Sequence, residues 1–435
     1  MAPYNAYSRS VVSRPGAQRA ATLAVVVAAL GYFVDIYDLI LFGTVRVASL
    51  KGIGITSPGA IEDQGIYLLN MQLGGMLVGG ILWGVLGDKR GRLSVLFGSI
   101  TLYSLANLAN GLVGDVDSLR SVQAYAVCRL VAGIGLAGEL GAGVTLVSEL
   151  MGARSRGVGT MIIAAVGVLG GLAAGAVGGA FGHVVDWTTA YYIGGVMGLA
   201  LLALRIGVVE SGMFETTLAK PVSRGNFFKL FTDRRRLGRY LAIIGVGVPV
   251  WYCIAILFVL APELGKALGL DPPPKASLAL SLFYGGASVG SLASGLISQY
   301  LRSRKRALAI SITATAAVTL AYYTVGGSAH WLFYTLAFVG GAGTGYWAIF
   351  VTTAAELFGT NLRATVTTTV PNFVRGSAVL LTVGYKALKD SLGPIGSGAT
   401  IGVLSFAVAF AGLATLRETF AVDLDYHEDD TTAGS

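Results

Sequence analysis

GVLGDKRGR, residues 84–92, is a short basic segment between two apolar runs, residues 64–86 and 93–113. Each run reaches the roughly 20 residues that an α-helix needs to cross a bilayer. A glycine-containing turn with one lysine and two arginines between such runs is typical of a helical hairpin whose turn stays in the cytoplasm. The segment therefore predicts a membrane protein built from paired helices.

The composition extends this prediction to the whole chain. Of 435 residues, 54% are hydrophobic and only 12% are charged, about half the charge of a soluble protein. Hydropathy predicts twelve spans, at residues 20–45, 64–86, 92–114, 122–149, 156–182, 187–209, 239–264, 276–301, 307–326, 331–356, 363–388 and 396–418. The first run is too long for a signal peptide, and no cleavage site follows it. We expect an all-α membrane protein with twelve transmembrane helices.

The distribution of basic residues predicts the orientation. With the amino terminus inside, 22 of the 31 lysines and arginines fall on cytoplasmic segments and 7 fall outside. The remaining two, Arg129 and Arg375, lie within predicted spans. This asymmetry follows the positive-inside rule, so both termini are predicted to be cytoplasmic.

An internal repeat divides the chain. ELMGARSR at 149–156 and ELFGTNLR at 356–363 share the pattern E-L-x-G-x-x-x-R, 207 residues apart. The longest loop, 210–238, is basic and separates six predicted spans from six. We therefore predict an amino-terminal half (1–209), a cytoplasmic linker (210–238) and a carboxy-terminal half (239–435) that ends in an acidic tail. Paired halves are typical of a large class of transporters, although chance similarity of two loop ends is the alternative.

Several motifs resemble those of one transporter family. GVLGDKRGR (84–92) closely matches the G-x-x-x-D-R/K-x-G-R signature of the major facilitator superfamily, and RLVAGIGLAGE (129–139) resembles its R-x-x-x-G-x-G motif. ESGMFE (210–215), AELFGTNLRAT (355–365) and VDIYD (34–38) are similar to segments of metabolite:proton, organic-ion and aromatic-acid:proton symporters. The resemblance covers nearly the whole chain and implies transport by alternating access.

The resemblance also implies a cytoplasmic gate. In the superfamily the loop signature latches the cytoplasmic side, whereas a plain topological turn would need only its basic charge. The implied gate residues are Gly84, Gly87, Asp88, Arg90, Gly91 and Arg92, with Glu149, Arg156, Glu356 and Arg363 from the repeat. The second-half copy, SQYLRSRKR (298–306), lacks the aspartate, and Gly212 stands where proline is usual after the sixth span.

Five ionisable residues lie well inside predicted spans, away from the span ends: Asp35, Asp38, Arg129, Glu139 and Arg375. Each costs about 2.5–3.5 kcal/mol near the bilayer centre on insertion scales. We therefore expect these side chains to face a cavity or one another rather than lipid.

The two aspartates suggest proton coupling. Asp35 and Asp38 are three residues apart and share a helix face, and two carboxylates this close resist joint ionisation. Arg129 falls at the same predicted depth as Asp38 and is expected to neutralise one of them. A static salt bridge that sets helix packing is the alternative. Glu139 is a second proton site, a substrate contact or a packing acid bonded to a neighbour.

Arg375 suggests an anionic substrate. It lies near the middle of its predicted span with Asn372 one turn away, and arginine favours bidentate recognition of carboxylates. The alternative is that Arg375 pairs with Asp35 or Glu139 across the cavity. Four aromatic residues near mid-span are predicted to line the same pocket: Trp251, Tyr252, Tyr346 and Trp347.

The sequence thus favours a proton-coupled symporter of a small organic anion. A symporter of a sugar or other neutral solute is one alternative, and a drug or metabolite exporter is another, although the fifth span lacks the proline expected of antiporters. We find no nucleotide-binding, metal-ligand or nucleophile–base pattern, so neither an enzyme, a cofactor nor nucleic-acid binding is expected. The expected partners are substrate, protons and lipid, for a monomer in a bacterial inner membrane.

Overall fold

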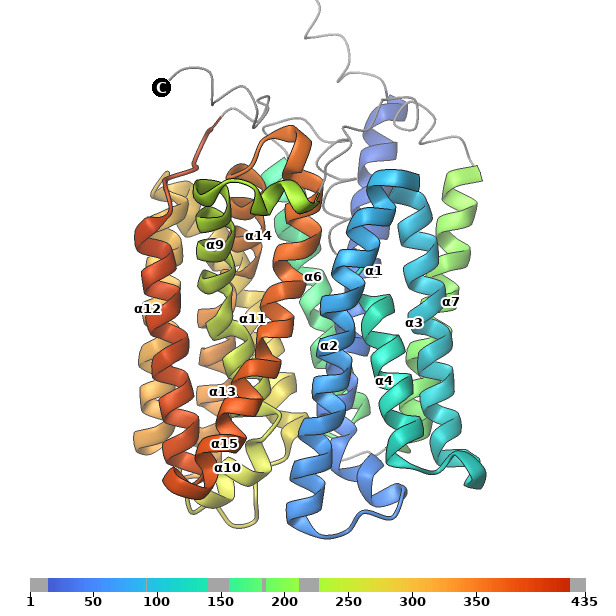
Figure 1. Cartoon of the computed structure of the whole chain (residues 1–435), viewed down its shortest axis with the longest axis vertical. Helices are drawn as coiled ribbons and strands as arrows, with labels where there is room; N and C mark the ends of the chain where they lie inside the picture. The colour runs from blue at the N-terminus through green and yellow to red at the C-terminus, as the bar shows by residue number, and fades with distance from the viewer. Residues whose placement is uncertain (1–14, 91, 140–155, 182–184, 211–226, 423–435) are drawn as a thin grey trace, which may run out of the picture.

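The computed structural model describes residues 15–90, 92–139, 156–181, 185–210 and 227–422, which are helices joined by turns and contain no strand (Figure 1). The first helix set comprises α1 (Pro15–Gly52), α2 (Pro58–Arg90), α3 (Arg92–Asp115), η1 (Asp117–Leu119), α4 (Val122–Leu136), α6 (Arg156–Val177) and α7 (Trp187–Glu210). The second helix set comprises η2 (Phe227–Phe231), α9 (Arg234–Tyr252), η3 (Cys253–Phe258), α10 (Ala261–Ala267), α11 (Ala276–Tyr300), α12 (Arg304–Val325), α13 (His330–Thr344), α14 (Trp347–Glu356) and α15 (Thr360–Thr415).

The predicted all-α membrane class is confirmed by the length and composition of these helices. Within the described part of the chain, nine helical segments are long and apolar enough to cross a membrane, and α4 and α6 contribute two shorter apolar helices. The longest segment, α15, is two helices, because Gly393 adopts a left-handed φ of 67° and Pro394 follows it. The break lies between the predicted spans 363–388 and 396–418.

Two predicted spans are interrupted within the bundle. The predicted span 239–264 consists of α9, a π-helical turn (η3) and α10, and Pro249 lies four residues before that turn. The predicted span 331–356 consists of α13 and α14, which meet at Gly345. A Cβ on Gly345 would overlap the backbone of Gly290 in α11, so only glycine permits this contact. Irregular backbone at membrane depth is tolerated where protein surrounds it.

The two helix sets pack internally and meet along two seams. In the first set α1 packs on α6 and α7, and α3 on α4 and α7; in the second, α9 packs on α15 and α11 on α13. The sets contact each other mainly through α6 with α11 and through α2 with α15. Figure 1 shows α2 beside α15 near the centre of the molecule. At the α6–α11 seam, a Cβ on Gly171 would overlap the ring of Tyr284, so the small residue permits close approach.

Three ion pairs join the helix sets at the end of the bundle where α1 finishes. They are Arg46–Glu263 (2.7 Å), Lys389–Glu62 (2.6 Å) and Lys386–Asp63 (2.7 Å). Arg46 is fully buried and also donates to the main-chain oxygens of Val259 and Ile61. This end, which the charge distribution assigns to the outside, is therefore closed by charge pairs between the sets.

A second polar network lies at the opposite end of the bundle. Ser303 caps the amino terminus of α12 and also donates to the Glu418 carboxylate. The same carboxylate accepts from the main-chain amide of Arg304 (2.8 Å). The Arg304 guanidinium binds Glu356 (3.2 Å), which also accepts from the Thr419 hydroxyl (2.8 Å). The segment after α15 is thereby tied to the start of α12.

We expect Glu418→Gln to lower the melting temperature of the detergent-solubilised protein by a few degrees at neutral pH. Partial burial alone would raise the pKa of Glu418, but hydrogen bonds from Ser303 and main-chain amides outweigh it and hold that pKa below its usual value. A carboxylate with a lowered folded-state pKa stabilises above its unfolded pKa, about 4.3, and loses this effect as the pH falls through the folded value. The difference from wild type should therefore shrink at more acid pH, whereas an undiminished difference would show that the charge is not what stabilises.

Candidate functional site

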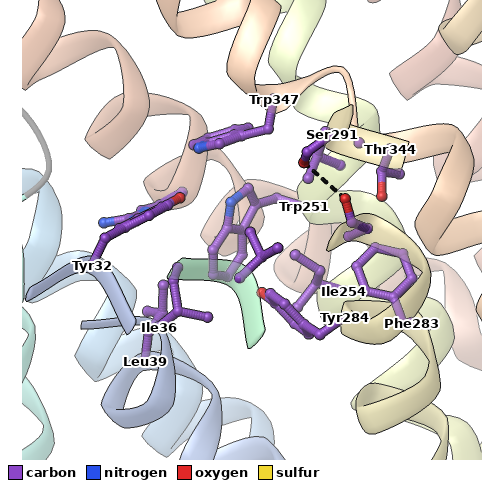
Figure 2. Close-up of a pocket in the computed structure, with 15 residues that line it drawn as sticks. Tyr32, Ile36, Leu39, Trp251, Ile254, Phe283, Tyr284, Ser291, Thr344 and Trp347 are labelled. Atoms are coloured by element: carbon purple, nitrogen blue, oxygen red, sulfur yellow. Dashed lines mark hydrogen bonds between the residues drawn. The ribbon is translucent and has the colours of Figure 1, made fainter. Parts of the chain in front are cut away.

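A small cavity lies between the two helix sets and is walled mainly by aromatic side chains. Figure 2 shows Tyr32, Ile36 and Leu39 on one side of it and Trp251, Tyr284, Phe283 and Trp347 around the rest. The first three residues come from α1, and the others come from α9, α11 and α14. Arg375 of α15 also lines the cavity. Each helix set therefore supplies part of the wall.

The cavity is small in this conformation. Its volume is about 30 Å³, and a buried water molecule needs about 10–15 Å³. The space thus has room for a few water molecules and none for an organic molecule. Because its walls belong to both helix sets, a larger ligand can enter only if the sets or their side chains move.

Arg375 meets Asp35 across the boundary between the sets, which is one of the two pairings that the sequence left open as the alternative to anion binding. The Nη2 atom of Arg375 donates to the Asp35 Oδ2 atom over 3.3 Å, and both side chains are almost fully buried. The contact is incomplete, because Arg375 Nε and Nη1 and Asp35 Oδ1 have no hydrogen-bond partner among the described residues. An arginine in this state retains two donors for another group.

The unused polar atoms that face the cavity are mainly donors. Besides the two on Arg375, the indole N–H of Trp347 meets hydrogen-bond geometry with no group in the described part of the chain, although the Tyr32 hydroxyl lies close to both Trp347 and Arg375. The hydroxyls of Ser291 and Thr344 are already directed to main-chain oxygens of their own helices, over 2.7 and 2.8 Å. Figure 2 draws the Ser291 bond as a dashed line. The arrangement suits a flat ligand that carries hydrogen-bond acceptors.

Three of the six predicted substrate residues line this cavity and three do not. Arg375, Trp251 and Trp347 are lining residues. Tyr252 instead donates to the Gly398 main-chain oxygen, Tyr346 donates to that of Val246, and Asn372 donates to that of Ala137. Each of these three groups joins neighbouring helices rather than facing the cavity.

Sequence reasoning missed the cavity face of α1. Tyr32, Ile36 and Leu39 recur at spacings of four and three, so they form one stripe on the helix. The signal was available, but α1 is apolar around its whole circumference and the stripe does not stand out. Tyr284 and Phe283 on α11 had no comparable signal.

Asp38 and Arg129 lie in the first helix set but form no ion pair in the structure. The Arg129 guanidinium donates to the Gln72 amide oxygen and lies 5.1 Å from the centre of the Phe42 ring. Both Asp38 oxygens are buried without a hydrogen-bond partner in the described residues. Arg129 still acts on Asp38 electrostatically, so the predicted proximity is present without a direct contact.

Glu139 pairs with Arg205 of α7. The Arg205 Nη1 atom donates to Glu139 Oε2 over 3.0 Å, and a second bond joins Nη2 to Oε1. Both side chains are buried. The orientation count places Arg205 on the cytoplasmic side because it lies near the end of its span. Of the three roles left open for Glu139, the structure corresponds to the one in which Glu139 is bonded to a neighbour.

Only part of the predicted gate lies in the described region. Gly84 lies beside Thr369 of α15, since a Cβ there would be 3.7 Å from the threonine methyl group. Glu356 binds Arg304, and Arg363 donates to the Ala355 and Phe358 main-chain oxygens. The remaining gate residues lie outside the part of the chain whose side chains are described: Gly87, Asp88, Arg90, Gly91, Arg92, Glu149 and Arg156.

Comparison with known proteins finds relatives that are named as transporters of several different small molecules. A sequence profile of the Major Facilitator Superfamily matches residues 28–383. The 3-(3-hydroxy-phenyl)propionate transporter of Escherichia coli (strain K12) is 29% identical over 59% of this chain and 64% of that protein. The probable 4-methylmuconolactone transporter of Cupriavidus pinatubonensis is 24% identical over 91% of this chain and 90% of its own.

Solved structures show the same fold. The proton:xylose symporter XylE bound to 6-bromo-6-deoxy-D-glucose superposes with a TM-score of 0.71, covering 94% of this chain and 98% of that one. A crystal structure of a D-xylose-proton symporter gives a TM-score of 0.64. The sequences are 16% identical in both cases, so the likeness concerns the fold alone.

The Glu139–Arg205 pair gives a stability prediction. We expect Glu139→Ala to destabilise the protein by about 3–5 kcal/mol, because it leaves the Arg205 charge buried without a partner. Glu139→Met/Arg205→Met should recover most of that loss, since apolar groups of similar volume often replace a buried pair at little cost. Thermal unfolding in detergent measures both variants. A double variant as unstable as Glu139→Ala would contradict a purely structural pair.

Proposed function

The chain belongs to the Major Facilitator Superfamily, whose members are transporters and not enzymes, and we propose that it carries a small organic carboxylate together with protons. We infer further that the carboxylate bears a flat, aromatic ring. The observation that carries this proposal is the guanidinium of Arg375, whose Nε and Nη1 atoms have no hydrogen-bond partner among the described residues and lie beside a cavity walled by aromatic rings.

The chemistry of the cavity supports an acid as substrate. A carboxylate supplies only acceptors, and the unused groups of Arg375 and Trp347 are donors. Aromatic walls favour a ring that can stack or meet them edge to face. The names of two relatives, a hydroxyphenylpropionate transporter and a methylmuconolactone transporter, agree with small ring-derived substrates.

A neutral sugar fits this cavity less well. Sugar hydroxyls donate as well as accept, so a sugar site needs acceptor side chains. The described lining residues include no asparagine, glutamine, aspartate or glutamate, and the side-chain acceptors that they do offer are hydroxyls, on Tyr32, Tyr284, Ser291 and Thr344. The structural likeness to xylose symporters therefore does not extend, in our proposal, to the substrate.

Asp35 offers a means of coupling substrate to protons. The substrate carboxylate and the Asp35 carboxylate would compete for the same guanidinium. Protonation of Asp35 removes its charge and frees Arg375 for the substrate, while an ionised Asp35 recaptures Arg375 as the substrate leaves. Each bound carboxylate would thus be accompanied by a proton on Asp35.

The fold supports alternating access around this site. Counting α4, α6 and both parts of α15 as crossings extends the nine candidate segments to twelve, with both termini in the cytoplasm of a bacterium. The halves, residues 1–209 and 239–435, would rock about the cavity in a monomer. Opening toward the outside would break the Arg46–Glu263 pair and its two neighbours.

Arg375 tests the charge of the substrate. We expect Arg375→Ala to weaken binding of 3-(3-hydroxyphenyl)propionate about ten- to hundredfold, because a hydrogen bond between charged groups contributes roughly 1.5–3 kcal/mol. Arg375→Lys should fall between Ala and wild type, since it keeps the charge and loses the fork. Titration calorimetry on purified protein measures the Kd values.

The matched control is Tyr346→Phe, a buried aromatic residue whose hydroxyl is bonded away from the cavity; it should leave the Kd unchanged. Wild type should bind neither the matched amide, 3-(3-hydroxyphenyl)propionamide, nor D-xylose with comparable affinity. Binding of D-xylose without binding of the acid would replace the carboxylate proposal with a neutral-solute transporter.

Asp35 tests the coupling. In wild type the affinity for 3-(3-hydroxyphenyl)propionate should rise as the pH falls, because protonated Asp35 no longer competes for Arg375. Asp35→Asn should bind the acid with an affinity that no longer changes with pH, and proteoliposomes containing it should not concentrate the acid in response to a pH gradient. A pH-driven accumulation that survives in Asp35→Asn would show that the proton is carried elsewhere.

A further inference from the structure

A group of buried polar atoms around Asp38 has no role in the cavity described above. Among the described residues, the atoms without a hydrogen-bond partner include both Asp38 oxygens, both polar atoms of the Asn107 amide, the Ser104 hydroxyl and the Tyr103 hydroxyl. All four side chains are at most 1% exposed. Buried polar groups are almost always hydrogen-bonded, to protein or to ordered water, so this concentration of unpartnered atoms needs an explanation.

These side chains lie against one stripe of α7. A Cβ on Gly194 would overlap the Asp38 Oδ1 atom, and a Cβ on Gly198, about 6 Å further along the helix, would overlap the Ser104 hydroxyl. The Asn107 amide faces Asp38 without meeting hydrogen-bond geometry. The two glycines thus leave room beside α7 for a polar strip along α3, which consists of Tyr103, Ser104 and Asn107.

Asp38 and Asp35 face different surroundings although they are three residues apart. Asp35 meets Arg375 of the second helix set, whereas Asp38 faces α3, α4 and α7 of the first set. The charged and titratable groups around Asp38 are Arg129, Tyr103, Tyr191, Tyr37 and Asp35.

The polar neighbours of Asp38 that have partners are engaged elsewhere. Arg129 donates to Gln72 and reaches the Tyr191 hydroxyl at 3.5 Å, and the Tyr37 hydroxyl donates to the Ala190 main-chain oxygen over 3.0 Å. Asp38 consequently has no direct ion pair among the described residues. An isolated carboxylate in this position is costly unless it is protonated or hydrated.

We propose that ordered water fills the space between Asp38, Asn107, Ser104 and Tyr103, and that protons reach Asp38, and from it Asp35 one helical turn away, by this route, which is separate from the substrate cavity. Water suits this set because it donates and accepts, as do the amide and hydroxyls of the strip. A sodium ion suits it less, because the Arg129 charge is close by and half of the amide is a donor. The transport role of the route rests on the proposed proton coupling.

Tyr103 extends the strip toward the other buried acid of the first set. It lies within electrostatic range of both Asp38 and Glu139. Glu139 follows Gly135 on the same predicted span, and this span runs toward the cytoplasm in the predicted orientation. The strip therefore leads from the outer half of the first helix set toward its inner half.

The first test measures hydration of Asp38 directly and does not depend on transport. Purified protein at a pH acid enough to protonate Asp38 is moved into D₂O, and the infrared carbonyl band that Asp38→Asn removes is followed. Deuterium exchange of that band within seconds is expected in wild type, and at least about tenfold slower exchange in Asn107→Leu. A wild-type band that exchanges only over hours would overturn the proposal.

The second test measures proton flux in proteoliposomes that contain a pH-sensitive dye. Addition of 3-(3-hydroxyphenyl)propionate should move protons with wild type, and Asn107→Leu and Ser104→Ala should reduce this flux about tenfold or more while leaving exchange of labelled for unlabelled acid. Ser99→Ala is the matched control, because this buried serine of α3 already donates to the Leu96 main-chain oxygen. Unchanged proton flux in both strip variants, or a sodium-driven flux that Asn107→Leu abolishes, would overturn the route. A wild type that moves the acid without protons would refute the proposed function, while the infrared test still decides hydration.

Discussion

The contact between Arg375 and Asp35 is the interaction on which the rest of the site depends. Each charge alone would be costly in the middle of a membrane bundle, and each comes from a different helix set. The contact is made through a single donor and acceptor over 3.3 Å, so both groups remain partly unsatisfied. A pair in this state holds the two sets together weakly and leaves the guanidinium able to accept a different anion. Arg375 also lines the small cavity that the aromatic side chains wall.

The two aspartates of α1 show how one helix can serve two environments. Asp35 faces the boundary between the sets, where a substrate would enter, and Asp38 faces the interior of the first set. Separation of this kind would let a proton approach through the first set while the substrate occupies the cavity. Arg129 lies close enough to influence Asp38 yet is held by Gln72 and the Phe42 ring.

Much of the architecture could be predicted from the sequence, because a hydrophobic run of bilayer length is a strong signal. The intramembrane charges could be found for the same reason, and Arg375 does line the cavity. The sequence could offer the Asp35–Arg375 pair only as one alternative, because the two residues are 340 positions apart and hydropathy does not specify how apolar helices rotate about their axes. The same limit explains why Tyr32 was missed and why Tyr252 and Tyr346 were placed in the pocket. Arg205 was counted with the cytoplasmic residues and not with the intramembrane charges, so its buried pairing with Glu139 was missed.

The most direct test of the central claim is proton uptake on substrate binding by the purified protein. In weakly buffered detergent solution near neutral pH, addition of 3-(3-hydroxyphenyl)propionate to wild type should raise the pH, because the acid displaces Asp35 from Arg375 and Asp35 then takes up a proton. The Asp35→Asn variant should bind the added acid without any change in pH. Tight binding of the acid to wild type with no proton uptake would contradict the competition between substrate and Asp35 for one guanidinium.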